Sequence, residues 1–224
     1  ILVGTGTINP NIVKEYTMQA RDLGCDAALV VTPYYVKPPQ RCLIAHYESL
    51  QNLLFPTVVY NVPGRTAVDM TDKSIAIVAA MDHMVGVKDA TGKVERVALL
   101  KSELEQQNVD DFLLYSGDDA TSMEYCLKGG DGCISVTANV AANEMHRLME
   151  AALGGNVETA TELNDTLDIL HEKLFCESNP IPTKYALYKM NKISSPYCRP
   201  PLDRLDKLFE SIVDDALRQA NIIV

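Results

Sequence analysis

The residues of this sequence best suited to chemistry are a lysine and a tyrosine, each at the end of an apolar segment. Lys88 follows Met84-Val-Gly-Val87, a pattern typical of a parallel strand buried on both faces. Partial removal of an ammonium group from water lowers its pKa, and the free amine attacks ketones to give a Schiff base. The pattern alone leaves open the alternative that Lys88 reaches the surface and pairs with Asp89.

Further polar side chains follow neighbouring apolar segments. Tyr60 ends Thr57-Val-Val-Tyr60, and a phenol beside a forming carbinolamine passes protons; the alternative is a tyrosine packed between helices. Arg65 lies in a Pro-Gly turn, where its planar guanidinium suits a carboxylate, although a solvated arginine is the commoner case. Tyr34 and Tyr35 follow a rigid proline and fit either a site or a subunit interface.

Composition excludes several classes of protein. The net charge is -10 and no basic run is present, which argues against a nucleic-acid surface. No apolar stretch reaches the roughly 18 residues that span a bilayer, and the chain opens on Ile1-Leu-Val3 without the basic start of a signal peptide. The six cysteines form no CxxC pair and the four histidines no HExxH pattern. We therefore expect a cytoplasmic protein with reduced thiols and no structural metal.

Strands and helices are predicted to alternate along most of the chain. The expected strands are 1–3, 27–32, 57–60, 84–88, 112–115 and 132–136. Helices are expected at 10–23, capped by Asn9, at 40–53, 71–81 and 94–107, after Asp119, and at 142–153. Asp118 is expected to cap the helix after Asp119. Three more helices follow near 157–175, 181–190 and 203–220, the last with an apolar face that includes Leu208.

Repeated βα units predict an α/β protein with a parallel sheet. An open doubly wound sheet is one possibility, but no GxGxxG or phosphate-binding loop marks a nucleotide site. Polar residues follow all the strands, as in a (β/α)₈ barrel. We expect residues 1–155 to form strands three to eight of such a TIM barrel and residues 156–224 a C-terminal three-helix appendage. About two βα units are then missing before Ile1, a count that follows from barrel closure.

Several motifs in order give a specific resemblance. They are Val31-Thr-Pro-Tyr-Tyr35, Tyr60-Asn-Val-Pro-Gly-Arg-Thr66, Gly86-Val-Lys-Asp-Ala-Thr-Gly92, Ser116-Gly-Asp-Asp-Ala120, Ile134-Ser-Val-Thr-Ala-Asn139 and Asn179-Pro-Ile-Pro182. From end to end the chain resembles the dihydrodipicolinate synthase family, among the pyruvate-dependent class I aldolases. The resemblance implies a (β/α)₈ barrel and a lyase that condenses pyruvate with L-aspartate 4-semialdehyde. That reaction is the first committed step of diaminopimelate and lysine biosynthesis.

The resemblance also implies roles for individual residues. Lys88 matches the lysine that forms the Schiff base, and Tyr60 the tyrosine that shuttles protons. Tyr35 matches a tyrosine that reaches across a dimer interface into the neighbouring site. Three positions match substrate-binding ones: Arg65 for the semialdehyde carboxylate, Ile134 for pyruvate, and Gly117. No cofactor is implied beyond the covalent imine, and the expected assembly is a homotetramer built as a dimer of dimers.

Two departures from the family pattern stand out. The threonine pair of an early Gly-Thr-Thr-Gly-Glu loop is absent, so we expect the sequence to be part of a longer enzyme. Lysine-sensitive members carry an asparagine and a glutamate where this chain has Ile8 and Ile12, which predicts weak or absent feedback by lysine. The alternatives are another pyruvate-dependent aldolase, acting on N-acetylneuraminate or keto-deoxy sugar acids, and a non-catalytic protein on a decayed aldolase scaffold. Arg65 in its motif favours the synthase over the neuraminate lyases.

Overall fold

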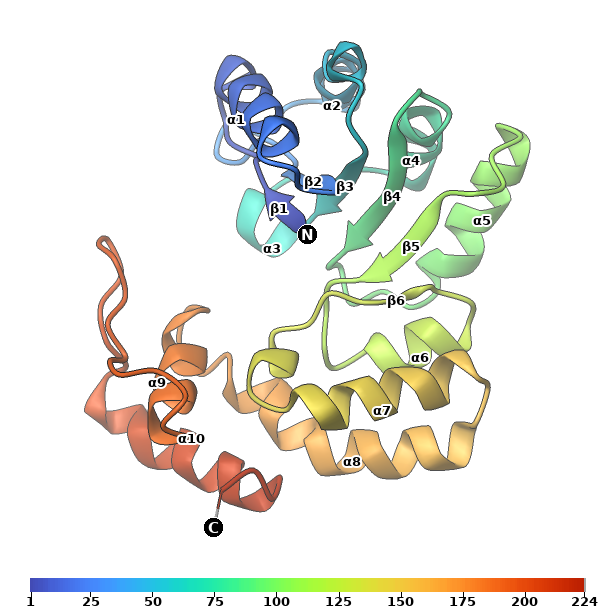
Figure 1. The fold of residues 1–224 in the computed structure, drawn as a ribbon. Helices are drawn as coiled ribbons and strands as arrows, with labels where there is room; N and C mark the ends of the chain where they lie inside the picture. Colours follow the sequence, from blue (N-terminus) through green and yellow to red (C-terminus); the bar gives the residue numbers. More distant parts are fainter. Residues whose placement is uncertain (224) are drawn as a thin grey trace. The chain divides into compact units, whose positions relative to one another are not determined.

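Short apolar segments of the chain form one parallel sheet. The computed structural model describes residues 1–223, and Figure 1 shows the strands with helices between them. The sheet order is that of the sequence, and each strand is parallel to the next. The strands are β1 (Leu2–Gly4), β2 (Ala27–Val31), β3 (Thr57–Asn61), β4 (Met84–Asp89), β5 (Leu113–Ser116) and β6 (Gly132–Cys133). The predicted α/β class and parallel sheet are confirmed.

Two of the helices between the strands begin after a residue whose side chain caps them, and the cap of the first, Asn9, was predicted. Helix α1 (Pro10–Asp22) starts after Asn9, whose side chain accepts a hydrogen bond from the Asn11 backbone at 3.0 Å. Helix α4 (Asp72–Ala79) starts after Thr71, which accepts from the Ser74 backbone. Helices α2 (Gln40–Glu48) and α5 (Arg96–Gln106) complete this group. Their buried faces supply fully buried core residues, among them Val13, Leu43, Tyr47, Ile75, Val78 and Val97.

Several predicted boundaries were wrong. The helix expected over 40–53 stops at Glu48, and a separate 3₁₀ turn, η1 (Gln51–Leu53), follows before Leu54 takes a left-handed conformation. The Pro-Gly turn after β3 is itself a short helix, α3 (Pro63–Thr66). Helix α6 (Ser122–Leu127) begins too far along the chain for Asp118 to cap it. Four residues cannot show a helical period, which is why α3 escapes pattern reasoning.

The last strand is much shorter than predicted. Only Gly132 and Cys133 pair with β5, and the chain then enters a 3₁₀ turn, η2 (Thr137–Asn139). The backbone N–H groups of Val136 and Thr137 donate to the Asp119 carboxylate, at 2.9 and 3.1 Å. These N–H groups therefore bond to a side chain instead of a neighbouring strand.

The chain divides into two compact units. Unit 1 contains residues 1–118 and 128–134, and so holds the whole sheet with α1 to α5; unit 2 contains residues 119–127 and those from 135 onward. In this division α6 and helix α7 (Ala142–Leu153) fall in unit 2. The boundary expected after residue 155 stays a prediction. The assignment of residues 1–155 to a barrel stays a prediction.

Unit 2 is built from helices. It contains the three predicted C-terminal helices, α8 (Val157–Lys173), α9 (Ile181–Lys189) and α10 (Lys207–Gln219). Val213, Ala216 and Leu217 of α10 are buried in one apolar cluster with residues of α7 and α8. Leu208 was expected on the buried face of the last helix but is 79% exposed. Asp214 joins α10 to α9 by accepting from Tyr185 at 3.1 Å and pairing with Lys189 at 2.9 Å.

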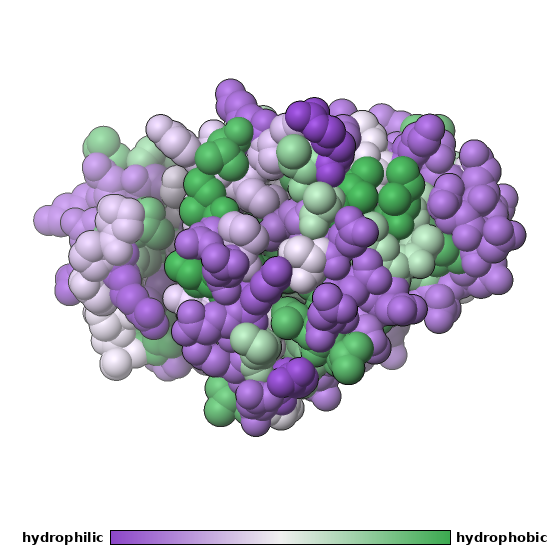
Figure 2. All heavy atoms as spheres, turned by 90° about the horizontal axis from the view of Figure 1, so that it is seen from above, coloured by the Kyte–Doolittle hydropathy of each residue, from purple (hydrophilic) through white to green (hydrophobic). Residues whose placement is uncertain are grey.

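Hydrophobic and hydrophilic residues are mixed on the face of the molecule that Figure 2 shows. Figure 2 shows hydrophobic residues in small separate groups among hydrophilic ones on the face seen from above. Among residues 1–223 no helix is long and apolar enough to cross a membrane.

Candidate active site

Lys88 and Tyr60 meet at the carboxyl ends of two adjacent strands. They are register partners in the parallel pair of β4 and β3, so their side chains leave the sheet on the same face. The Lys88 Nζ lies 4.5 Å from the centroid of the Tyr60 ring, within the range of a cation–π contact. Both side chains are half-buried. The arrangement places an amine and a phenol together at the carboxyl end of the parallel sheet, where α/β enzymes carry their sites.

Gly117 leaves room for the lysine. It follows β5, and its backbone N–H donates to the Asp89 carbonyl at 2.8 Å. A Cβ built at Gly117 would lie 2.7 Å from Lys88 Cε and 2.9 Å from Ala90 Cβ. Such distances are below van der Waals contact, so a side chain here displaces the Lys88 methylenes. Gly117 therefore shapes the space occupied by Lys88.

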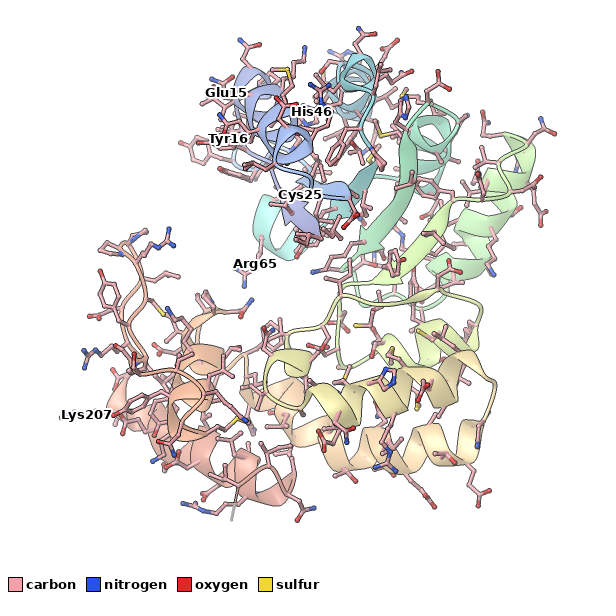
Figure 3. All side chains as sticks on the ribbon, in the orientation of Figure 1. Glu15, Tyr16, Cys25, His46, Arg65 and Lys207 are labelled. Atoms are coloured by element: carbon pink, nitrogen blue, oxygen red, sulfur yellow. The ribbon has the colours of Figure 1, made fainter. Side chains whose placement is uncertain are left out.

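A pocket of about 400 Å³ is lined by Tyr60 and not by Lys88, so it adjoins the pair on the tyrosine side. It brings Tyr60 together with Arg65 and Tyr34, and its remaining wall is largely apolar: Gly4, Gly6, Leu29, Val31, Val62 and Thr66. The Tyr34 hydroxyl lies 3.5 Å from Thr7 Oγ1. Figure 3 shows the Arg65 side chain extending from α3, with its guanidinium away from the helix. A cavity of this size accommodates a small keto acid and presents a cation to its carboxylate.

The protonation of Tyr60 is set by two opposing effects. Burial raises the pKa of Tyr60, because the phenolate loses its solvation, and the positive charge of Arg65 offsets part of the rise. Tyr60 is consequently a phenol at neutral pH. It is able to donate a proton and to take one back when a charge develops beside it.

The two remaining predicted site residues lie elsewhere. Tyr35 is 87% exposed and has a left-handed backbone with φ 71°, so within one chain it points to solvent while Tyr34 lines the pocket. Ile134 lies just after β6, and its N–H donates to the Ser116 carbonyl at 2.9 Å. A backbone contact from Ile134 to a substrate would therefore use its carbonyl oxygen.

Sequence reasoning missed some residues around the site. Gly6 and Thr66 line the pocket, and a buried polar group behind the sheet, formed around Asn61 and Arg96, was not foreseen. One available signal was the polar pair Asn61 and Asp89, each directly after a candidate site residue. Residues that alternate with inward-facing ones point to the opposite face of a strand, where polar groups need partners.

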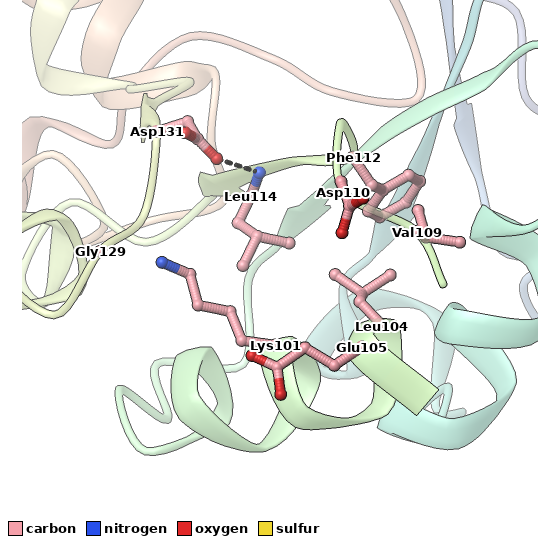
Figure 4. Close-up of a pocket in the computed structure, with 9 residues that line it drawn as sticks. All are labelled: Lys101, Leu104, Glu105, Val109, Asp110, Phe112, Leu114, Gly129 and Asp131. Carbon is pink, nitrogen blue, oxygen red and sulfur yellow. Dashed lines mark hydrogen bonds between the residues drawn. The ribbon is translucent and has the colours of Figure 1, made fainter. Parts of the chain in front are cut away.

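A second pocket lies at the amino end of β5. Figure 4 shows Lys101 of α5 extending toward Gly129, while the Asp131 carboxylate accepts a hydrogen bond from the Leu114 backbone at 2.7 Å. The cavity is about 250 Å³ and is lined in part by Leu104 and Phe112. It is remote from Lys88, which stands at the opposite end of the strands, and it holds no residue predicted to be functional.

The chain matches one protein family over nearly its whole length. Residues 1–220 match the sequence model of the Dihydrodipicolinate synthetase family. The chain belongs to this family. A 4-hydroxy-tetrahydrodipicolinate synthase of Thioalkalivibrio sulfidiphilus is 45% identical over 223 residues, which are 99% of this chain and 74% of the relative.

Solved structures of the dihydrodipicolinate synthetase family share the fold. The enzyme of Acinetobacter baumannii, solved with pyruvate and described as chloride-inhibited, has a TM-score of 0.93 at 42% identity; the match covers all of this chain and 75% of that one. The Thermotoga maritima enzyme has a TM-score of 0.94 at 35% identity, covering 99% and 75% of the two chains. A synthase variant described as the first monomeric one also has a TM-score of 0.94, at 35% identity and with 99% and 74% covered.

Proposed function

We propose that this chain carries the Schiff-base site of a lyase that condenses pyruvate with L-aspartate 4-semialdehyde to give 4-hydroxy-tetrahydrodipicolinate. The observation that carries the proposal is the pairing of Lys88 with Tyr60 at adjacent strand ends. Membership of the family supports it, because the curated relatives carry the name of this synthase. A relative solved with pyruvate supports the choice of the first substrate.

The first stage is formation of the imine. The neutral amine of Lys88 attacks the ketone carbon of pyruvate, and the carbinolamine that forms loses water. Tyr60 donates the proton that the departing hydroxyl needs, which fits a phenol whose pKa is raised by burial. The product is a protonated Schiff base, which withdraws electrons from the neighbouring methyl group.

The second stage joins the two substrates. Loss of a methyl proton gives an enamine, whose carbon attacks the semialdehyde aldehyde to form a carbon–carbon bond. The amine of the second substrate then attacks the imine carbon, closes the ring and expels Lys88 as the free amine. Protons move through Tyr60 in both directions, so the enzyme returns to its starting state with no cofactor.

The other predicted residues take supporting roles. Arg65 binds the semialdehyde carboxylate from the rim of the pocket, where its guanidinium suits bidentate bonding. Ile134 contacts pyruvate through its backbone, and Gly117 keeps the space that Lys88 occupies. Tyr35 acts in the site of a neighbouring subunit, a role that its exposed position supports.

The proposal extends to the fold and assembly. We infer that the parallel sheet is six-eighths of a (β/α)₈ barrel, strands three to eight, followed by the C-terminal helices. The relatives support this: they are longer, with about a quarter of their length unmatched by this chain, which leaves room for two more βα units. The assembly that we propose is a homotetramer made of two dimers.

Borohydride trapping tests the chemistry directly. The full-length protein is incubated with pyruvate and reduced, and its peptides are mapped by mass. We expect a stable adduct on Lys88, because reduction converts the imine to a secondary amine. Lys88→Arg keeps the charge but forms no imine, so its adduct is lost; Lys93→Arg, four residues away, is the matched control and retains it.

The outcomes separate the alternatives. An adduct on a different lysine would show that the site is not at Lys88. The absence of any adduct in a folded protein would favour the non-catalytic scaffold. With the adduct on Lys88, turnover is then compared between L-aspartate 4-semialdehyde and the reverse cleavage of N-acetylneuraminate or keto-deoxy sugar acids. Turnover only in a cleavage reaction would overturn the synthase and leave the Schiff base intact.

A further inference from the structure

Behind the candidate site, on the other face of β3 and β4, two polar side chains meet. Consecutive strand residues point to opposite faces, so Asn61 and Asp89 lie opposite their sequence neighbours Tyr60 and Lys88. They are themselves register partners. The Asn61 Nδ2 donates to Asp89 Oδ1 at 2.9 Å, and the Asn61 carbonyl accepts from the Ala90 backbone at 2.8 Å.

The Asn61 amide also binds the segment that leads into α4. Its Nδ2 donates to Asp69 Oδ1 at 2.9 Å, and its Oδ1 accepts from the Met70 backbone at 3.0 Å. The Asn61 side chain is fully buried, and its bonds to Asp89 and to the Met70 backbone are buried as well. The side-chain amide of Asn61 therefore links the end of β3 by hydrogen bonds to the end of β4 and to residues 69–70.

Arg96, the first residue of α5, closes this network. Its guanidinium donates to Asp69 at 2.7 Å and to the Met70 carbonyl at 2.7 Å, and pairs with Asp72 at 2.7 Å. Asp89 lies 3.6 Å away. The Arg96 side chain is only 8% exposed, so three carboxylates compensate one buried cation.

Asp69 and Arg96 are held in their charged forms by their neighbours. Burial opposes ionisation of Asp69, but the bonds from Asn61 and Arg96 outweigh it and lower the pKa of that carboxyl. Burial likewise disfavours the Arg96 cation, and the nearby carboxylates, Asp89 foremost, outweigh it and raise the pKa. Asp89 also accepts from Thr91 Oγ1 at 2.5 Å.

We propose that Asn61 and Arg96 are positioning residues for the Schiff-base chemistry: they hold the ends of β3 and β4 in alignment, and so hold Tyr60 against Lys88. The inference rests on the proposed function. Neither residue touches the reacting atoms. Each acts through Asp89, whose carbonyl accepts from the Gly117 backbone at 2.8 Å. A shift of Asp89 therefore moves Lys88 and also the glycine that shapes its space.

Three variants test the proposal in the full-length protein. Asn61→Asp is isosteric, but it loses both donated bonds and places a third carboxylate between Asp69 and Asp89. Arg96→Met removes the cation, and Arg96→Lys keeps the charge without the planar fork. The primary readout is the first-order rate constant for the borohydride-trapped imine with pyruvate, per folded molecule, together with its pH profile.

We expect the rate constant for imine formation to fall by about 10- to 100-fold in Asn61→Asp and Arg96→Met. Misplacing reacting groups by about an ångström lowers a rate by this order of magnitude. Arg96→Lys recovers part of the rate. Leu100→Ala is the control: Leu100 lies on the same helix and is 2% exposed, but it belongs to the apolar core. It lowers the melting temperature and leaves the rate constant and its pH profile unchanged.

Two results are decisive against the idea. If Asn61→Asp and Arg96→Met lose stability as Leu100→Ala does but form the imine at the wild-type rate, the network is structural only. The same conclusion follows if Leu100→Ala slows the imine as much as they do. Failure of the proposed function looks different, because the wild-type protein then forms no adduct at all.

Discussion

At the scale of single residues, the contact between Gly117 and Lys88 yields a direct prediction. Gly117→Ala places a methyl group 2.7 Å from Lys88 Cε and 3.0 Å from Cγ, so the lysine side chain must leave its position over Tyr60. We expect slower trapping of the pyruvate imine, by about 10-fold or more, with Lys88 still chemically intact. The measurement is the time course of the reduced adduct.

The matched control is another glycine-to-alanine change. Gly64→Ala adds the same methyl group, but nothing lies within 4 Å of its Cβ. Its trapping rate stays at that of the wild type. Equal rates for Gly117→Ala and wild type would mean that Lys88 reaches its reactive position by another path.

Regulation is also predicted from single residues. Ile8 is 38% exposed before α1, and Ile12 lies on that helix, where lysine-sensitive relatives are expected to carry an asparagine and a glutamate. Two aliphatic side chains offer neither a hydrogen bond nor a charge to an amino acid. We expect turnover by the full-length enzyme to be insensitive to micromolar L-lysine. The double variant Ile8→Asn with Ile12→Glu measures how much sensitivity these two positions restore, and strong inhibition of the wild type would contradict the prediction.

The residues that sequence reasoning identified share a property. Lys88 and Tyr60 stand out because each ends an apolar run, and parallel strands bring such ends together. Arg96 gives no comparable signal: its partners Asp69, Asp72 and Asp89 come from other segments of the chain, and only the packing of α5 brings them together. Contacts of that kind depend on tertiary structure.

At the scale of elements, helix α2 carries a histidine that makes stability depend on pH. His46 is buried, its Nε2 has no hydrogen-bond partner, and burial, with a smaller contribution from the charge of Lys14, lowers its pKa to about 4. The unfolded chain takes up this proton near pH 6.5 and the folded chain only near 4. The free energy of unfolding is therefore unaffected by this histidine above pH 6.5. It decreases by about 3 kcal/mol as the pH falls from 6.5 to 4.

Denaturant unfolding from pH 7 to pH 4 measures this loss. His46→Phe keeps a ring beside Tyr47, where the two rings now make an edge contact at 5.1 Å, but it has no proton to bind. The free energy of unfolding of the variant should decline less over this range. Parallel pH curves for the two proteins would show that His46 titrates normally.

The elements themselves were predictable to different degrees. Some helices have a capping residue and a long run of apolar residues at helical spacing. Such helices, for example α1 and α10, begin within a few residues of the expected place. The end of β6 was not predictable, because the Asp119 carboxylate binds the backbone of residues 136–137. A side chain from a preceding loop leaves no trace in the pattern of the strand that it ends.

At the scale of the whole molecule, the exposed Tyr35 allows a test of assembly. We mix two variants, Lys88→Arg and Tyr35→Phe, each of low activity alone. If Tyr35 serves the neighbouring subunit, one site of a hybrid dimer combines an intact Lys88 with an intact Tyr35. Random mixing of equal amounts then restores about a quarter of the wild-type activity per subunit.

The result has a clear opposite. If Tyr35 serves its own chain, both sites of every hybrid keep one defect and no activity returns. Mixing under conditions that prevent subunit exchange is the control, since it leaves the variants as separate homodimers. A monomeric mass in solution would remove the basis of the prediction, as the monomeric synthase variant among the solved structures illustrates.

The α/β class followed from repeated apolar segments, whereas the membership of each helix in a compact unit depends on tertiary contacts. Helix α7 follows the strands in sequence and packs with α8 in unit 2. Which helices share a core depends on which faces meet. Sequence order alone does not specify that choice.

The alternation along β3 and β4 also bears on how related sequences diverge. Losing a single codon within 84–87 would turn Lys88 toward Asn61 and Arg96 and bring Asp89 to the face that Lys88 now occupies, because each strand residue faces opposite its neighbour. One deletion would destroy the nucleophile and bury a misplaced cation. Length differences between descendants of this gene should therefore accumulate in connecting segments, such as the one around Asn108. Segments 57–61 and 84–89 should change by substitution alone.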